Sequence, residues 1–159
     1  MGFVVEACRD VSELARAFSV ISHYFGGVGP NPDEAERLAH VFDYRRALVI
    51  RDAGEIVGAA SSHAYELTVP GGMVPAAGVT IVGVRPTHRR RGVLRALMRE
   101  QLDRLREAGE PVAYLWASAE TLYGRFGYGM SSLAADIDLP KHECRFAEPS
   151  EPRGQVRAV

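Results

Sequence analysis

The sequence has few of the residues that mark disulfide-bonded, metal-binding, membrane or secreted proteins. Its 159 residues include only Cys8 and Cys144, near opposite ends, with no C-x-x-C pair and no Cys/His cluster. Neither a disulfide framework nor a metal site is therefore expected. No apolar stretch approaches the roughly 20 residues needed to span a bilayer, and the N-terminus MGFVVEACRD lacks the pattern of a secretory signal. We expect a cytoplasmic protein with no metal and no membrane partner.

The chain also lacks the excess of positive charge that nucleic-acid-binding proteins show. Its formal net charge is -1 and its pI is about 6.5, and no aromatic residues alternate with its arginine cluster, so we expect no nucleic-acid partner. A Walker-type nucleotide site is excluded because the sequence has no G-x-x-x-x-G-K-[ST] motif. The hydrophobic content of 47% is ample for one core.

Apolar periodicity and turn signals predict a mixed α/β fold. The segment Asn31-Pro32-Asp33-Glu34 is a strong helix start, because it offers an N-cap side chain, a proline at N1 and a glutamate at N3. We expect one domain over residues 1–140 and a tail or linker over residues 141–159. Helices are expected over residues 11–25, 32–42, 93–108 and 120–126, and strands over residues 3–7, 47–51, 56–69, 78–84, 112–117 and 130–139.

The most informative segment is VTIVGVRPTHRRRGVLRALM, which covers residues 79–98. A strand-like run ends at Pro86, an arginine-rich turn closes on Gly92, and an amphipathic helix follows at once. Between Arg85 and Arg99 there are six arginines and no acidic residue. Guanidinium groups beside the N–H groups of a helix N-terminus suit a polyphosphate. A solvated basic turn is the alternative.

The turn Arg89-Arg90-Arg91-Gly92 resembles the pyrophosphate loop of the GNAT acetyltransferases, although Leu94 stands where the general pattern has Gly or Ala. The longer string PTHRRRGVLRALM is similar to one branch of that family, the Eis-type (enhanced intracellular survival) N-acetyltransferases. The earlier LTVPGG turn and the later AS and YGRFGYG strings also match this branch, in the same order along the chain. The resemblance covers essentially the whole chain, but only the first domain of such proteins.

This resemblance implies a GNAT fold, an α/β (α+β) mixed sheet that is mostly antiparallel, with flanking helices. The fourth and fifth strands of that fold splay apart, and acetyl-CoA lies in the opening. By resemblance, the backbones of Val82 and Val84 would pair with the pantetheine arm. The remaining cofactor-binding residues that the resemblance implies are Arg89, Arg90, Gly92, Val93 and Ser118.

The activity implied by the resemblance is transfer of the acetyl group of acetyl-CoA to a primary amine. Tyr123 matches the general-acid tyrosine of the family and would give its proton to the departing thiolate, while Tyr128 is expected to be structural. The acceptor would be an aminoglycoside, a polyamine or a lysine on a peptide. The alternative is a non-catalytic acyl-CoA-binding or sensory domain of a larger protein.

The general base is not identified by the sequence. In Eis-like enzymes it is associated with the terminal carboxylate of a later domain. Either this chain is a fragment of a longer protein, or another carboxylate, water or Val159 itself would have to serve. His23, His40 and His63 receive no role, and Trp116 is expected to lie in the core. The tail resembles the passage into a following domain, and an assembly of two or more copies stays open, with no interface assigned.

Overall fold

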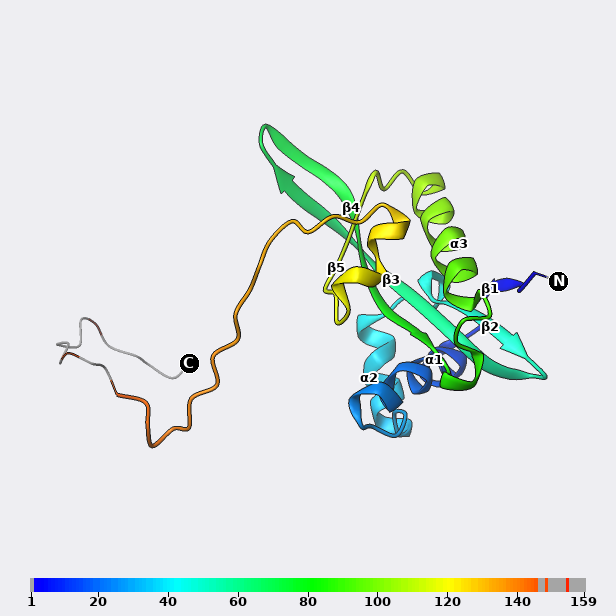
Figure 1. Cartoon of the computed structure of the whole chain (residues 1–159), viewed down its shortest axis with the longest axis horizontal. Coiled ribbons are helices and arrows are strands. Elements are labelled where there is room, and N and C mark those ends of the chain that lie inside the picture. Colours follow the sequence, from blue (N-terminus) through cyan, green and yellow to red (C-terminus); the bar gives the residue numbers. More distant parts are fainter. Residues whose placement is uncertain (1, 146–147, 149–153, 155–159) are drawn as a thin grey trace. The chain divides into compact units, whose positions relative to one another are not determined.

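The structure is a computed structural model of the chain, and it describes residues 2–145, 148 and 154. The chain divides into two units, Met1–Gly129 and Met130–Val159, and the first contains every helix and strand named here (Figure 1). The helices are α1 (Val11–Ser22), α2 (Pro32–Val41) and α3 (Val93–Glu107), with the short 3-10 helices η1 (His23–Phe25), η2 (Tyr44–Arg46), η3 (Pro86–His88), η4 (Glu120–Leu122) and η5 (Gly124–Phe126). The strands are β1 (Val5–Ala7), β2 (Leu48–Asp52), β3 (Glu55–Val69), β4 (Gly72–Val84) and β5 (Val112–Leu115).

The strands form one mixed sheet in the order β1-β2-β3-β4-β5. Neighbours from β1 to β4 are antiparallel, whereas β5 runs parallel to β4. A parallel neighbour needs a crossover connection, and α3 supplies it between β4 and β5 (Figure 1). The predicted fold class, a mostly antiparallel mixed sheet with flanking helices, is confirmed.

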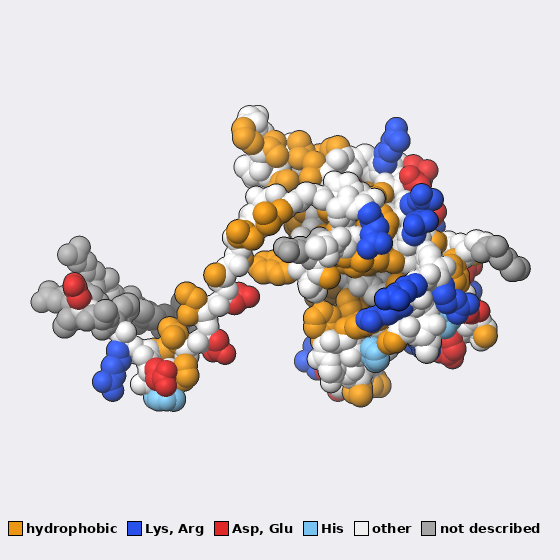
Figure 2. Space-filling model, viewed as in Figure 1, with side chains coloured by type: hydrophobic (Ala, Val, Ile, Leu, Met, Phe, Trp, Pro, Cys, Tyr) orange, Lys and Arg blue, Asp and Glu red, His pale blue; other side chains and the backbone are white. Residues whose placement is uncertain are grey.

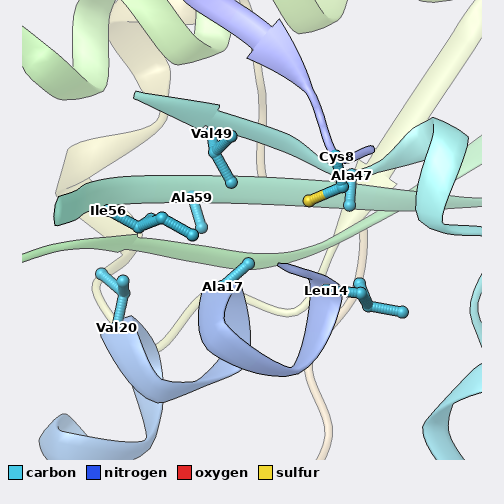
Figure 3. Packing of buried hydrophobic residues seen from close by; sticks show 8 residues of the cluster. All are labelled: Cys8, Leu14, Ala17, Val20, Ala47, Val49, Ile56 and Ala59. Carbon is cyan, nitrogen blue, oxygen red and sulfur yellow. The ribbon is translucent and has the colours of Figure 1, made fainter. Parts of the chain in front are cut away.

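The two faces of the sheet are covered by different helices. Leu14, Ala17 and Val20 of α1 pack with Val49 and Ala59 of the sheet (Figure 3). The residues next to Val49 point to the opposite face, as strand alternation requires, and contact α3. That second cluster consists of Leu48, Ile50, Val57, Ala60, Val93 and Leu97.

A glycine in β3 lets α3 approach the sheet closely. A Cβ placed on Gly58 would lie 2.5 Å from Cγ1 of Val93 and 3.0 Å from Cδ1 of Leu97. These distances are shorter than van der Waals contact, so a larger residue fits only if the side chains of Val93 and Leu97 move. Gly58 therefore leaves the room in which these two side chains of α3 lie against the sheet.

The pairing of β4 with β5 stops before β4 ends. The two strands pair only over Ala76–Val79 and Val112–Leu115, while β4 continues to Val84. Ile81 has a φ of +56°, and the register between β3 and β4 shifts at Ala59/Ser61, which together mark a bulge. Beyond Val79, one edge of β4 is thus free of β5, as the predicted separation of the fourth and fifth strands requires.

Some element predictions differ from the structure. β4 begins at Gly72 rather than Gly78, and residues 120–126 form two 3-10 turns rather than one helix. The strand predicted over residues 130–139 is wrong, because no strand forms there. Met130, Leu133 and Ile137 are 77–85% exposed, so the alternation in this segment does not reflect burial against a sheet.

The expected core position of Trp116 is also wrong. Its side chain is 79% exposed, since β5 ends at Leu115 and Trp116 follows the paired part of the strand. The division into a domain over 1–140 and a tail over 141–159 stays a prediction. Among the described residues, none of the helices is both long enough and apolar enough to span a bilayer.

Candidate functional site

A cleft of about 850 Å³ opens at the end of β4. Its walls come from the end of α1 with η1, from the last residues of β4, from the loop and first turn of α3, and from the segment after β5. Every predicted site residue lines it, although these residues come from distant parts of the sequence. They are Val82, Val84, Arg89, Arg90, Gly92, Val93, Ser118 and Tyr123.

The loop before α3 presents backbone N–H groups to this cleft. After the 3-10 turn η3, Arg90 and Gly92 both take left-handed conformations, with φ of +61° and +92°. Gly92 is the N-cap of the 15-residue helix α3, and a glycine has no side chain with which to satisfy the first N–H groups. Such a helix start, with its N–H groups and dipole, is suited to bind an anion.

The arginines of the loop have different partners. Arg85 pairs with Glu55 at 3.1 Å and Arg91 with Asp52 at 3.5 Å. Among the described side chains, no carboxylate lies within ion-pair distance of Arg89 or Arg90. Both guanidinium groups line the cleft, so their positive charge is available to an anion there. Figure 2 shows basic side chains gathered over α3 and the loop that precedes it, and in this part of the sequence all of them are arginines.

Tyr123 lies in the 3-10 segment after β5 and lines the other wall of the cleft. Burial raises the pKa of its hydroxyl above the ordinary value of 10.0, so the group stays protonated at neutral pH and can donate a proton or a hydrogen bond. Its ring contacts Tyr128 in an edge-to-face arrangement, with centroids 5.9 Å apart. Burial raises the pKa of Tyr128 to about 12.

The sequence analysis missed the wall formed by α1 and η1. Tyr24 donates a hydrogen bond from its hydroxyl to the carbonyl oxygen of Val84. Arg89 places its guanidinium 4.9 Å from the centroid of the Tyr24 ring, and its Nε donates to the Tyr24 hydroxyl over 3.3 Å. Ile21 and Phe25 complete this wall. The one available signal was an aromatic pair at a helix end, directly before two glycines.

The histidines left without a role, His23, His40 and His63, are absent from the described residues that line the cleft. Burial, with a smaller contribution from Arg46, lowers the pKa of His63, and its ring packs against Phe42 with centroids 4.4 Å apart. Within the described part of the chain, no three His, Cys, Asp or Glu side chains are grouped so that they could hold a metal ion.

A family model described as "Acetyltransferase (GNAT) domain" matches residues 10–131. The chain belongs to the GNAT acetyltransferase family. This agrees with the arginine-rich loop, with the separation of β4 from β5 and with the position of the cleft. The family predicted from the sequence is confirmed.

Relatives within the GNAT family support the predicted resemblance to its Eis branch. An uncharacterized N-acetyltransferase of Streptomyces avermitilis is 46% identical over 127 residues, which cover 78% of this chain and 31% of the relative. The N-acetyltransferase Eis of Mycobacterium tuberculosis is 39% identical over 153 residues, covering 83% of this chain and 38% of the relative. The crystal structure of Eis1 from Mycobacterium abscessus superposes with a TM-score of 0.70 at 41% identity, covering 80% of this chain and 31% of that one. The chain thus spans about a third of the length of these relatives.

Proposed function

We propose that this chain binds acetyl-CoA in the cleft at the end of β4 and transfers its acetyl group to a primary amine. The observation that carries the proposal is the convergence of an unpaired strand edge, an arginine-rich helix start and a half-buried tyrosine on one cleft. Each of the three supplies one function that the reaction needs: placement of the thioester, neutralisation of the phosphates, and a proton for the leaving group.

The phosphates of the cofactor would be bound at the start of α3. Arg89 and Arg90 offer guanidinium donors, and the N–H groups that follow Gly92 point along the helix axis toward the same region. Charge-assisted hydrogen bonds of this kind are about twice as strong as neutral ones. Bulky residues at position 92 would strain a backbone with φ of +92°, which supports the expected role of Gly92.

The pantetheine arm would extend the sheet along the free edge of β4. Its amides can exchange hydrogen bonds with the backbone groups of Val82 and Val84, in the manner of an added strand. Tyr24 already donates a hydrogen bond to the Val84 carbonyl, so the arm would either displace this hydroxyl or share the oxygen with it. Ser118, on the facing wall, is the expected side-chain contact of the cofactor there.

The chemistry assigned to Tyr123 is proton donation. In the reaction the amine nitrogen bonds to the thioester carbon, the carbon–sulfur bond breaks, and the sulfur leaves as a thiolate. The Tyr123 hydroxyl, which is protonated at neutral pH as an ordinary tyrosine is, would protonate that thiolate and afterwards recover a proton from solvent. The proton that the amine loses goes to a base that the described residues do not identify.

Calorimetric titration of the purified chain with acetyl-CoA tests the first half of the proposal, and thiol release in the presence of aminoglycosides, polyamines and lysine peptides tests the second. Saturable binding with amine-dependent thiol release is the expected result. Binding without release by any amine would favour the alternative of a non-catalytic acyl-CoA-binding domain. Absence of binding would overturn the proposal.

A further inference from the structure

One carboxylate contacts the phosphate loop at two points. Asp52, at the end of β2, places Oδ2 3.0 Å from Nε2 of His88 and 3.5 Å from NH2 of Arg91. The other ring nitrogen of His88 lies 2.9 Å from the Thr87 hydroxyl. His88 and Arg91 stand on either side of Arg89 and Arg90, the two arginines proposed to bind phosphate. Asp52 therefore contacts the loop on both sides of the two arginines proposed to bind phosphate. We call residues 88–91 the bracketed segment.

The bracketed segment contains a strained backbone. Arg90 has a φ of +61°, a conformation that L-residues other than Asn, Asp and Gly rarely adopt. Such a conformation is unfavourable for a residue with a side chain and persists only when its surroundings hold it. Asp52 contacts side chains on both sides of Arg90, those of His88 and Arg91.

We propose that Asp52 is a positioning residue for cofactor binding, which holds the phosphate loop in its strained form through His88 and Arg91. This inference rests on the proposed function, because it assumes that the loop binds the phosphates of CoA. Asp52 is absent from the described residues that line the cleft, so it acts through its two partners and not by touching the cofactor.

The sign of the effect separates this role from a purely electrostatic one. As a negative charge close to the phosphates, Asp52 would weaken their binding, and its removal would tighten it. As a positioning residue, Asp52 strengthens binding, and its removal lets the loop relax away from the cleft. Asp52→Asn removes the charge and keeps the shape of the side chain, so the direction of the change in Kd decides between the two roles.

The same hairpin offers a matched control. Glu55 opens β3 and pairs with Arg85 at 3.1 Å, with both side chains well exposed at 69% and 43%. Arg85 and Glu55 are absent from the described cleft lining, and Arg85 lies outside the segment of residues 88–91 that Asp52 contacts. Glu55→Gln therefore removes a carboxylate of the same hairpin without releasing the bracketed segment.

The experiment measures the Kd of CoA, and the inhibition constant of pantetheine, for wild type, Asp52→Asn, Asp52→Glu and Glu55→Gln. We expect Asp52→Asn to raise the Kd of CoA about tenfold, equivalent to about 1.4 kcal/mol. Pantetheine, which lacks the pyrophosphate, should bind as it does to wild type. The KM of acetyl-CoA should rise in parallel while kcat at saturation is retained. Asp52→Glu should fall between wild type and Asp52→Asn, and Glu55→Gln should match wild type.

An unchanged or lower Kd of CoA in Asp52→Asn would overturn the inference, and so would an equal loss of pantetheine binding, which indicates general damage to the cleft. Failure of the wild-type chain to bind CoA would instead count against the proposed function. The two failures are therefore distinguishable in one set of titrations.

Discussion

Tyr123 and Tyr128 are neighbours with similar burial, yet only Tyr123 belongs to the cleft lining in the described structure. This difference supports the choice of Tyr123 over Tyr128 in the proposed mechanism. Tyr123→Phe keeps the ring and its contact with Tyr128 but removes the hydroxyl. We expect the Kd of acetyl-CoA to stay near its wild-type value while kcat falls by about 10²–10⁴-fold, measured by thiol release at saturating cofactor.

Tyr128→Phe is the control for this substitution. The Tyr128 hydroxyl is buried without a hydrogen-bond partner among the described residues, so its removal should leave kcat unchanged and should not lower the melting temperature. Full activity in Tyr123→Phe, or equal losses in the two variants, would remove the general-acid role from Tyr123.

Arg89 and Arg90 are expected to contribute most of the electrostatic part of cofactor binding. Each charge-assisted bond contributes about 1.5–3 kcal/mol, so replacement of both by alanine should raise the Kd of acetyl-CoA at least about a hundredfold. Calorimetry measures this directly. Arg85→Ala, which removes an arginine paired with Glu55, should bind almost as wild type does. Similar losses in both variants would mean that the loop acts only through its total charge.

Among single residues, the sequence predicted those members of the cleft lining that belong to local motifs. The loop from Arg89 to Val93 and the tyrosine string after β5 can be found because their chemistry lies in consecutive residues. Tyr24 and Asp52 could not be found in this way, because their contacts with Val84, Arg89 and His88 join segments far apart in the chain. Periodicity alone placed Tyr24 at the end of an ordinary amphipathic helix.

The packing of α3 on β3 connects stability with the site. In Gly58→Ala the new methyl carbon would meet Cγ1 of Val93 at 2.5 Å, so the side chain of Val93, and with it the first turn of α3, must adjust. Overpacking of this kind costs about 1–3 kcal/mol. We expect a lower free energy of unfolding by urea titration, together with weaker CoA binding, since Val93 and Gly92 carry the helix start into the cleft.

Gly72→Ala is the matched control for Gly58→Ala. Gly72 opens β4, and a Cβ there would have no atom within 4 Å. This variant should keep both the stability and the CoA affinity of wild type. A Gly58→Ala protein that retains wild-type stability would show that α3 adjusts without cost.

Elements with a strong local signal were predicted well, and elements defined by pairing were not. The capping box at Asn31 and Glu34 is present as predicted, because it depends on residues three positions apart. The early start of β4 depends on its register with β3, where Gly72 pairs with Val69. The segment over residues 130–139 has the alternation of a strand but no ladder, and alternation alone does not provide a pairing partner.

A buried carboxylate links the N-terminal helix of the molecule to its sheet. Glu13 of α1 is 2% exposed. Burial alone would raise its pKa, but hydrogen bonds from the Arg51 guanidinium and from the backbone N–H of Arg9, the latter at 2.8 Å, hold the pKa below the ordinary value of 4.5. A lowered folded-state pKa stabilises the protein above the unfolded-state pKa, and this contribution is lost as the pH falls below it.

We therefore expect the free energy of unfolding to decrease as the pH is lowered from 5 toward 3. Glu13→Gln should be less stable than wild type at pH 7 by about 1–3 kcal/mol, because it removes the buried one of the two carboxylates that pair with Arg51 and leaves only the more exposed Glu6. The two proteins should converge in acid, where Glu13 is protonated. Urea titrations at several pH values measure both curves. A constant difference at every pH would show that the ionisation of Glu13 does not contribute.

The bulge at Ile81 connects two properties of the sheet, its stability and the width of the opening between β4 and β5. Ile81 is a buried β-branched residue in a left-handed conformation, which is unfavourable for this side chain. Substitutions that let β4 continue as a regular strand would relieve this conformation and draw β4 toward β5. Variants of this strand selected for thermal stability alone would therefore be expected to lose the cleft, so that a more stable protein is also a less active one.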